Sequence, residues 1–240
     1  MRGAAVDRAM AAHRHAAVPV MREAPLFALE GIFKGWPEAP AILDGVDLSL
    51  ERGMAVSVTG RNGAGKTTLL RIAAGLISPE RGTVRLVGFD VERDRTEFQR
   101  RLGFVSAGNS GLYARLKTRH HLELWSRLAL VTRRQRDGLI ARTREEFALN
   151  PLWNKRVDRL SMGQRQRLRL ALAFLHQPEV VLLDEPTTSL DEGGIAVMST
   201  ALESLKARGG AALVCLPSGW DRIPAMDAEF TLAGGRLEVV

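Results

Sequence analysis

Short stretches in which apolar and polar residues alternate occupy the first quarter of the chain. They cover residues 27–33 and 48–58 and are punctuated by glycines and prolines, a pattern typical of strands and turns. Residues 55–59 predict a buried strand, and residues 66–77 show the three- and four-residue apolar spacing of a helix. A glycine-rich segment separates the two, so the pattern predicts strand, loop and helix in direct succession.

The pattern changes between residues 98 and 159 to long, charged, weakly amphipathic stretches with few β-branched residues. We interpret this segment as a mostly helical insertion. Helical spacing resumes at Ser161 and ends at Pro178, and the apolar runs at 180–183 and 211–216 then predict buried strands. Alternating helices and buried strands indicate an α/β sheet, and the lack of a low-complexity linker makes the insertion a subdomain of one folding unit.

Length and composition narrow the class of protein. The 240 residues, of which 45% are hydrophobic and 25% charged, are typical of one or two soluble globular domains and exclude a disulfide-stapled miniprotein. No apolar run approaches the roughly 18 residues that span a bilayer. The lone Cys215 favours a reducing cytoplasm. Because residues 1–25 lack a continuous apolar stretch, we expect a mobile N-terminal tail rather than a signal peptide.

Positive charge is concentrated in one segment. Residues 93–169 hold 19 Lys and Arg against 7 Asp and Glu, whereas the formal charge of the whole chain is +7. Such a segment suits anionic lipid, nucleic acid or acidic loops of a partner, and the alternative is that arginine is simply abundant throughout. The charges are not accompanied by aromatic interleaving of the kind that proteins use to stack bases, which makes nucleic acid an unlikely partner.

The segment after the predicted strand fits the pattern G-x-x-x-x-G-K-[ST]. Its glycines let backbone N–H groups crowd against phosphate oxygens, where a Cβ would fill the concavity. We expect Lys66 to reach the β and γ phosphates and Thr67 to present its hydroxyl to Mg²⁺, with the positive end of the following helix completing the anion site. The pattern predicts a nucleoside triphosphate site, against the alternative of an ordinary glycine-rich turn. The motif reads Gly60-Arg61-Asn62-Gly63-Ala64-Gly65-Lys66-Thr67.

Two acids follow the apolar run at 180–183, where open α/β sheets place their ligands. Adjacent residues on an extended chain point in opposite directions, so Asp184 and Glu185 are predicted to do different jobs. We assign Asp184 to Mg²⁺, directly or through water, and Glu185 to the attacking water as general base. The alternative is a helix-capping or solvated pair of acids.

A third motif lies between these two and reads Leu160-Ser161-Met162-Gly163-Gln164-Arg165-Gln166-Arg167. Ser161 looks like an N-cap, and with Gly163 it predicts N–H groups at a helix start that could bind an anion; an ordinary capped helix is the alternative. The spacing closely resembles the LSGGQ signature of the ATP-binding cassette (ABC) family. The resemblance covers about residues 26–238 and includes a D-loop-like Ser189-Leu190-Asp191.

The resemblance implies a fold and a set of ligand contacts. The fold is a P-loop NTPase core, with a RecA-like mixed sheet and an N-terminal antiparallel β subdomain, and residues 26–240 form one nucleotide-binding domain with a helical signature subdomain at about 98–165. Two cassettes meet head to tail, as a homodimer or a heterodimer, so that the signature of one closes over the ATP of the other. Trp36 stands where the family keeps an aromatic that stacks on adenine; packing is the alternative. The resemblance implies further residues for ATP binding, in addition to Lys66, Thr67 and Asp184. They are Trp36, Gly60, Asn62, Gly63, Ala64, Gly65, Thr68, Ser161, Gly163, Gln164 and Asp191.

Two positions depart from the family's pattern. Ala107 stands at the place of the Q-loop glutamine, and Pro217 at the place of the switch histidine. A methyl group cannot bind Mg²⁺, and a proline side chain neither donates nor accepts a hydrogen bond. Asn109 and Ser218 are the nearest replacements. We expect ATP binding to survive and hydrolysis to be slow, or an intact site to come from a different cassette.

The resemblance implies a function in transport. The chain would be the ATP-hydrolysing subunit that powers a separate membrane-spanning permease, at the cytoplasmic face of the membrane. Residues 111–124 resemble the segment that follows the Q-loop in bacterial exporters and receives the partner's cytoplasmic helix, which favours export over uptake. The alternatives are a soluble ABC-type ATPase with a nucleic-acid or assembly role, and a regulatory subunit that binds ATP without useful hydrolysis.

Overall fold

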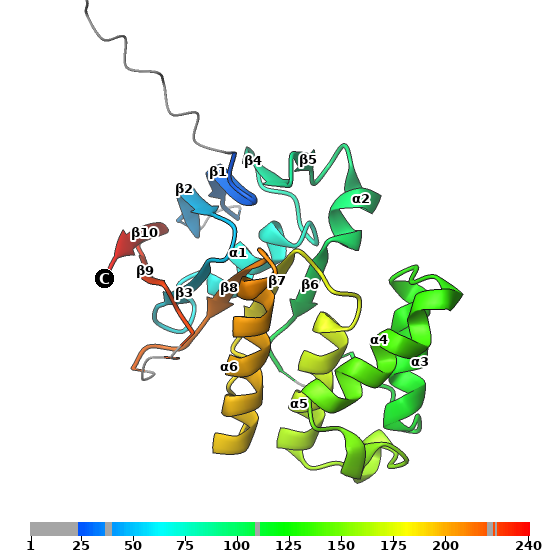
Figure 1. The fold of residues 1–240 in the computed structure, drawn as a ribbon. Coiled ribbons are helices and arrows are strands. Elements are labelled where there is room, and N and C mark those ends of the chain that lie inside the picture. Colours follow the sequence, from blue (N-terminus) through cyan, green and yellow to red (C-terminus); the bar gives the residue numbers. More distant parts are fainter. Residues whose placement is uncertain (1–23, 37–39, 109–110, 220–222, 224) are drawn as a thin grey trace, which may run out of the picture.

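The computed structural model describes residues 24–36, 40–108, 111–219, 223 and 225–240, so all but two residues of the predicted tail lie outside it. Strands in the described residues form two sheets (Figure 1). Their bounds are β1 (Phe27–Lys34), β2 (Leu43–Leu50), β3 (Ala55–Thr59), β4 (Arg81–Leu86), β5 (Phe89–Asp90), β6 (Leu102–Val105), β7 (Val180–Asp184), β8 (Ala211–Cys215), β9 (Ala228–Ala233) and β10 (Arg236–Val239). One sheet has the order β2-β1-β4-β5 and is antiparallel, and the other has the order β10-β9-β3-β8-β7-β6.

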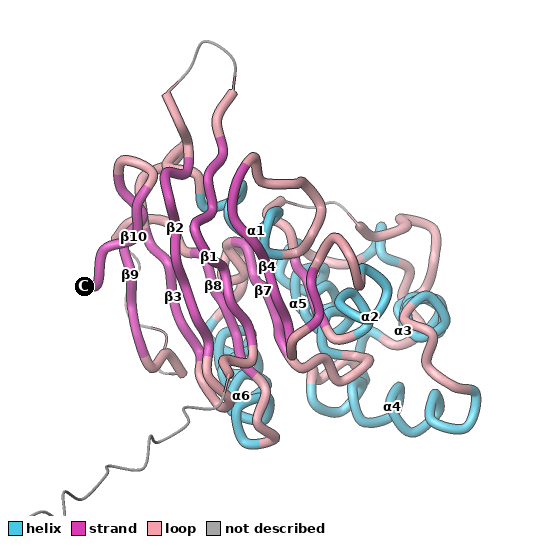
Figure 2. Tube along the Cα trace, turned by 90° about the horizontal axis from the view of Figure 1, so that it is seen from above, coloured by secondary structure: helices cyan, strands magenta, loops and turns pink. Residues whose placement is uncertain are grey.

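The helices pack around the larger sheet and extend to one side of it, as Figures 1 and 2 show. Helices α3, α4 and α5 contact one another, whereas α1 contacts β7 and β8, and α6 contacts β8. In the part of the chain that the structure describes, every helix is too short or too polar to cross a bilayer. The helices are α1 (Lys66–Ala73), α2 (Arg95–Arg100), α3 (Thr118–Leu128), α4 (Arg133–Glu146), α5 (Met162–Phe174) and α6 (Glu192–Ala207), with short 3₁₀ turns at Asn150–Leu152 and Val157–Arg159.

Both faces of the larger sheet are buried, because successive side chains of a strand point to opposite faces. Val181 and Leu183 of β7 belong to a core shared with α5 and α6. Val180 and Leu182 belong to a second core shared with α1 and the antiparallel sheet. This double burial explains why β7 and β8 are continuous apolar runs.

The parallel strands bring four loops to one edge of the sheet. Strands β9, β3, β8, β7 and β6 are parallel neighbours, so their carboxyl ends lie together. The glycine-rich loop leaves β3, residues 106–108 leave β6, Asp184 ends β7, and Pro217 follows β8. In open α/β sheets this edge is where ligands bind.

The predicted α/β fold with an N-terminal antiparallel sheet is confirmed, with one local difference. The strands and turns predicted over 48–58 are also present, as the end of β2, a turn at Gly53 with a left-handed φ of 75°, and β3. Strand β6 lies inside the segment interpreted as mostly helical. It has only four residues, too few to show a period, and a Cβ on Gly103 would lie 2.3 Å from the Ala173 carbonyl oxygen, so it packs closely against α5.

Candidate functional site

Glycines shape the loop between β3 and α1 in two different ways. A Cβ on Gly60 would lie 2.7 Å from the Leu232 carbonyl oxygen, and a Cβ on Gly65 would lie 2.9 Å from Ile42. Packing therefore requires these two glycines. Gly63 has a left-handed φ of 83° and open space where a Cβ would point. Open space of the kind that the prediction requires for phosphate oxygens therefore lies at Gly63, and its use by phosphate stays a prediction.

The ammonium of Lys66 is turned back onto its own loop. The side chain is buried, and Nζ donates to the carbonyl oxygens of Gly60 at 2.6 Å and Arg61 at 3.2 Å. These two acceptors are neutral and do not neutralise its charge, so phosphate oxygens can replace them with a gain in electrostatic energy.

The amino-terminal end of α1 is open to an anion. No side chain caps the helix, whose N-cap residue is Gly65, and the amides of Lys66, Thr67 and Thr68 form its first turn. Asn62 is exposed on the loop, and the amide of Ala64 donates to the Arg61 carbonyl in a turn at 3.1 Å. The loop therefore presents backbone donors and one buried cation.

Asp184 and Glu185 differ in backbone and in burial. Asp184 ends β7 and is 1% exposed, whereas the half-buried Glu185 has a left-handed φ of 47°. The expectation that both lie on an extended chain is therefore wrong for Glu185. A left-handed non-glycine residue costs of order 1 kcal/mol or more, and a hydrogen bond from its N–H to the Cys215 carbonyl at 2.9 Å holds this turn. The two carboxylates still differ in burial and in backbone conformation, as different roles would require.

The Cys215 thiol lies at the meeting point of the loop and the acids. Cys215 pairs with Asp184 in the sheet, and its Sγ lies 3.9 Å from the Lys66 carbonyl oxygen. Burial, with the nearby Asp184 and Glu185 carboxylates, raises the pKa of the thiol well above its ordinary value, while the Lys66 ammonium opposes the shift. The sheet pairing and the contact with the Lys66 carbonyl thus place the start of α1 and the end of β7 beside the same cysteine.

The Asp184 carboxylate has one oxygen that fits a metal ion. Its Oδ2 accepts a hydrogen bond from the Ala107 amide at 3.4 Å, whereas Oδ1 is buried without a hydrogen-bond partner. A buried, unsatisfied carboxylate oxygen is unfavourable, and a hard cation such as Mg²⁺ would satisfy it. No cluster of three or more His, Cys, Asp or Glu that could hold a metal occurs in the described residues, and Thr67 stays the predicted second protein ligand.

The signature segment begins helix α5 with a reciprocal cap, which confirms the N-cap predicted at Ser161. The Ser161 hydroxyl accepts from the Gln164 amide, and the Gln164 side chain accepts from the Ser161 amide, both at 3.2 Å. Ser161 and Met162 are exposed. The cap leaves this helix start at the surface, where a second molecule can approach it.

Gly163 and Asp191 both have structural duties within this chain. A Cβ on Gly163 would lie 2.6 Å from the Ser189 carbonyl oxygen, so the signature packs directly on the D-loop-like segment. Asp191 caps α6 by accepting from the Gly194 amide at 2.7 Å, and it lies 3.6 Å from the Arg167 guanidinium. Their roles toward nucleotide remain predictions.

Trp36 lies at the surface, as an adenine-stacking residue must. It is 53% exposed, and the Lys34 ammonium lies 5.0 Å from the centre of its ring. This exposure excludes packing in the core and leaves surface packing as the alternative, and the stacking role stays a prediction.

The loops at the two departures from the family's pattern are half-buried at Ala107 and Pro217, and Ser218 is exposed. Asn109 lies outside the described residues.

Sequence reasoning missed Arg169, a buried arginine whose guanidinium donates to the carbonyl oxygens of Ser106 and Gly108. The available signal was an arginine within the apolar run 168–172 of a helix.

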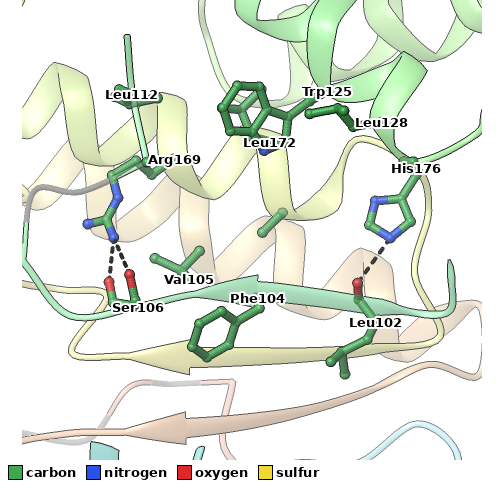
Figure 3. Close-up of a pocket in the computed structure, with 13 residues that line it drawn as sticks. Leu102, Phe104, Val105, Ser106, Leu112, Trp125, Leu128, Arg169, Leu172 and His176 are labelled. Atoms are coloured by element: carbon green, nitrogen blue, oxygen red, sulfur yellow. Dashed lines mark hydrogen bonds between the residues drawn. The ribbon is translucent and has the colours of Figure 1, made fainter. Parts of the chain in front are cut away.

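A pocket of about 330 Å³ opens beside this loop, between β6, α3 and α5 (Figure 3). Its walls are mostly apolar, and Leu128 at the end of α3 is 66% exposed. The partner-facing segment predicted at 111–124 contributes Gly111 and Leu112, whereas Trp125 and Leu128, the residues by which α3 lines the pocket, lie just after it. His176 Nε2 donates to the Leu102 carbonyl at 3.1 Å, and burial lowers the pKa of this imidazole.

The amino-acid sequence of this chain is similar to those of known proteins. Residues 43–188 match the profile of the family described as "ABC transporter". The ABC transporter ATP-binding protein NatA of Bacillus subtilis is 35% identical over 161 residues, or 67% of this chain and 65% of NatA. The daunorubicin resistance ATP-binding protein DrrA3 of Streptomyces coeruleorubidus is 37% identical over 204 residues, or 82% of this chain and 64% of DrrA3. The chain thus spans slightly less than two thirds of the length of these two relatives.

Solved structures show the same fold. The ATP-binding subunit of an ABC transporter superposes with a TM-score of 0.81 over 89% of this chain and 88% of its own, at 24% identity. A dimeric ATP-binding cassette in a post-hydrolysis state, bound to ADP and Pi, superposes with a TM-score of 0.78 over 88% of this chain and 96% of its own, also at 24% identity.

Proposed function

This chain belongs to the ABC transporter family, and from that premise we propose that it binds and hydrolyses ATP to power a separate membrane-spanning permease. The observation that carries the proposal is that Cys215, which pairs with Asp184 in the sheet, has its Sγ 3.9 Å from the Lys66 carbonyl oxygen, so the phosphate loop and the acidic end of β7 meet at the carboxyl edge of the parallel sheet. A phosphate loop facing an unsatisfied buried carboxylate is the arrangement that a nucleotide with its Mg²⁺ would complete.

Each part of the site has a role in the proposed reaction. Lys66 and the first-turn amides hold the β and γ phosphates, with Gly60, Asn62, Gly63, Ala64 and Gly65 shaping the loop around them. Thr67 and Asp184 would hold Mg²⁺, which when bound would offset phosphate charge. Glu185 takes a proton from the water that attacks the γ phosphorus, and ADP leaves. Trp36 stacks on the adenine.

A second cassette completes the site. The exposed start of α5, with Ser161, Gly163 and Gln164, caps the ATP held by a neighbouring subunit, and Asp191 lies beside this interface. One chain supplies both halves, so a two-fold homodimer builds two sites. A heterodimer with another cassette is the alternative, and the replacements at Ala107 and Pro217 favour it.

The membrane partner contacts the pocket between β6, α3 and α5. An apolar cavity with the exposed Leu128 at its rim, in the segment that carries the excess of positive charge, suits a helix from a permease near anionic headgroups. The chain would then be peripheral, at the cytoplasmic face of the membrane. The names of the relatives DrrA3, for daunorubicin resistance, and BcrA, for bacitracin transport, support export, although a phosphate import protein, PstB 2, is also among its relatives at 32% identity.

A second candidate is a regulatory subunit that binds ATP with little hydrolysis. It is favoured by Ala107 and Pro217, which lack the side chains that the family uses beside the γ phosphate. Retention of Glu185 favours turnover.

Steady-state ATP hydrolysis by the purified full chain, alone and reconstituted with a co-expressed permease in lipid nanodiscs, separates the two candidates. The motor proposal predicts turnover that the permease stimulates and that Glu185→Gln abolishes. ATP binding without turnover in either preparation would support the regulatory subunit, and absence of ATP binding would contradict both.

A further inference from the structure

Arg169 is a buried cation to which the described residues supply no acidic partner. It lies in the middle of α5 and is 7% exposed, and no Asp or Glu of the described residues lies within ion-pair distance of its guanidinium. Burial lowers its pKa, although an arginine stays charged. A buried charge is unfavourable unless its hydrogen bonds are satisfied, so the groups that satisfy this one are informative.

The guanidinium holds the loop that follows β6. One terminal nitrogen donates to the Gly108 carbonyl and to Gln166 Oε1, the latter at 2.8 Å. The other donates to the carbonyl and the hydroxyl of Ser106, as Figure 3 shows. The two carbonyls lie 61 and 63 residues away in sequence and flank Ala107. The planar fork of an arginine fixes both of them at once.

One peptide group joins this cation to the proposed metal site. The carbonyl of Ser106 and the amide of Ala107 belong to the same planar peptide, and in a trans peptide they point in opposite directions. The carbonyl side accepts from Arg169, while the amide side donates to Asp184 Oδ2 at 3.4 Å. A cation on the carbonyl polarises the peptide and strengthens the N–H as a donor to the carboxylate.

Gln166 joins the same arrangement to the turn after β7. Its Oε1 accepts from Arg169 and its Nε2 donates to the Pro186 carbonyl at 2.9 Å. Helix α5 therefore holds two segments near Asp184: the loop after β6, through Arg169, and the turn after β7, through Gln166.

We propose that Arg169 is a positioning residue for Asp184: through the Ser106–Ala107 peptide it keeps Oδ2 occupied and directs Oδ1 to Mg²⁺. The inference rests on the proposed function, because Mg²⁺ at Asp184 is part of it. The arrangement links Asp184 to α5 through the backbone, at a position where the side chain is only a methyl group. Arg169 also lines the pocket. A group bound in the pocket would therefore be connected to Asp184 through the Arg169 side chain and the Ser106–Ala107 peptide.

The test uses the full chain with three substitutions and one matched control. Arg169→Met keeps much of the apolar stem and removes every donor, Arg169→Lys keeps the charge without the fork, and Ala107→Pro removes the amide proton and leaves α5 intact. The control is Arg208→Met, because Arg208 is also an arginine whose pKa burial lowers, and it donates to the Pro178 carbonyl at 3.2 Å, before β7 begins.

Two readouts do not depend on hydrolysis. Mn²⁺ binding to the ADP complex, followed by electron paramagnetic resonance, is expected to weaken about tenfold or more in Arg169→Met and Ala107→Pro, and less in Arg169→Lys, since groups that orient a metal ligand have effects of this size. ADP affinity without metal stays within about twofold. Amide exchange at residues 106–108 of the nucleotide-free protein accelerates in both Arg169 variants, and the control matches the wild type in both measurements.

The outcomes separate this inference from the proposed function. Unchanged Mn²⁺ affinity in folded Arg169→Met, or an equal loss in Arg208→Met, overturns the positioning role. Should Arg169→Met fail to fold, Arg169→Lys and Ala107→Pro decide in the same way: unchanged Mn²⁺ affinity in both overturns it, and a loss in both supports it. A wild-type chain that binds no ADP would instead overturn the proposed function.

Discussion

Two buried cations, Lys66 and Arg169, satisfy their hydrogen bonds in the same way but at different distances along the chain. Lys66 donates to carbonyls five and six residues away, within its own loop. Arg169 donates to carbonyls 61 and 63 residues away, on a loop that follows a different strand. The first cation belongs to a local motif, and the second belongs to the tertiary structure.

The difference shows what each cation is free to do. The Lys66 ammonium can exchange its loop carbonyls for a phosphate at little structural cost, because the loop is shaped by Gly60 and Gly65 rather than by the lysine. Releasing Arg169 would leave the carbonyls of Ser106 and Gly108 without this donor and would loosen the loop beside Asp184. Lys66 is therefore suited to ligand binding, and Arg169 to holding a position.

Removing the Lys66 ammonium tests the local side of this comparison with the largest expected effect. Lys66→Ala should weaken ATP binding by about 100-fold or more, because charge-assisted hydrogen bonds to the phosphates are lost. Isothermal titration with Mg·ATP measures this. Lys206→Ala is the control, since Lys206 also donates to a backbone carbonyl, of Ala225, and forms an ion pair with Asp227. Equal affinities in Lys66→Ala and wild type would contradict the phosphate-loop assignment.

Neutralising Glu185 sharpens the distinction between binding and chemistry. Glu185→Gln should lower turnover about 100-fold or more, as loss of a general base does, and should leave ATP affinity within about threefold. The ATP-bound dimer should then accumulate and elute earlier in size-exclusion chromatography. Glu179→Gln, at the other end of β7, serves as the control. Wild-type turnover in Glu185→Gln would mean that another group activates the water.

Restoring the family's side chains at positions 107 and 217 tests the loops after β6 and β8, which lie far from the Lys66 loop in sequence. Ala107→Gln combined with Pro217→His should raise turnover about tenfold if the missing groups limit stabilisation of the γ phosphate in the transition state. The rate of phosphate release reports the change, and the single variants show which loop limits it. No increase, in variants that bind ATP normally, would show that other residues do this work.

The smallest expected effect is a change of the free energy of unfolding with pH. It concerns His121 on α3, the helix that packs against α5 and so supports the helix of Arg169. His121 is fully buried, its Nε2 accepts from the Tyr113 amide at 2.9 Å, and burial lowers its pKa below the ordinary 6.5. The unfolded chain therefore binds the proton more readily, so stability is complete above about pH 6.5 and falls as the pH drops below it, by at most ~1.4 kcal/mol per pH unit for this group.

Urea unfolding at pH 7.5 and 5.5 measures this dependence. The difference between the two pH values should shrink in His121→Phe and should persist in His120→Asn, which changes the half-buried neighbour. A pH dependence that His121→Phe leaves unchanged would assign the acid sensitivity to other groups.

The sequence predicts those features that depend on neighbours along the chain. The glycine-rich loop, the apolar β7 and the cap at Ser161 each follow from fewer than about ten consecutive residues, and each is present in the structure. Strand β6 was not predicted because four residues show no period and its place depends on packing against α5.

The tertiary part of the site was beyond sequence reasoning for a related reason. At position 107 the relevant group is a backbone amide, which every non-proline residue carries, so the alanine gave no sign of its contact with Asp184. Arg169 was recognisable only as a charged residue on an apolar helix face. Even the left-handed turn at Glu185 depends on the carbonyl of Cys215 on the adjacent strand.

Hydrogen–deuterium exchange of the full chain with and without Mg·ATP tests the central claim most directly, because it reports where the nucleotide sits. A triphosphate held by Lys66 and the start of α1 predicts strong protection of the amides at residues 60–68, together with smaller protection at 184–185. Protection confined to other regions, at ATP concentrations that saturate binding, would contradict the nucleotide site described above.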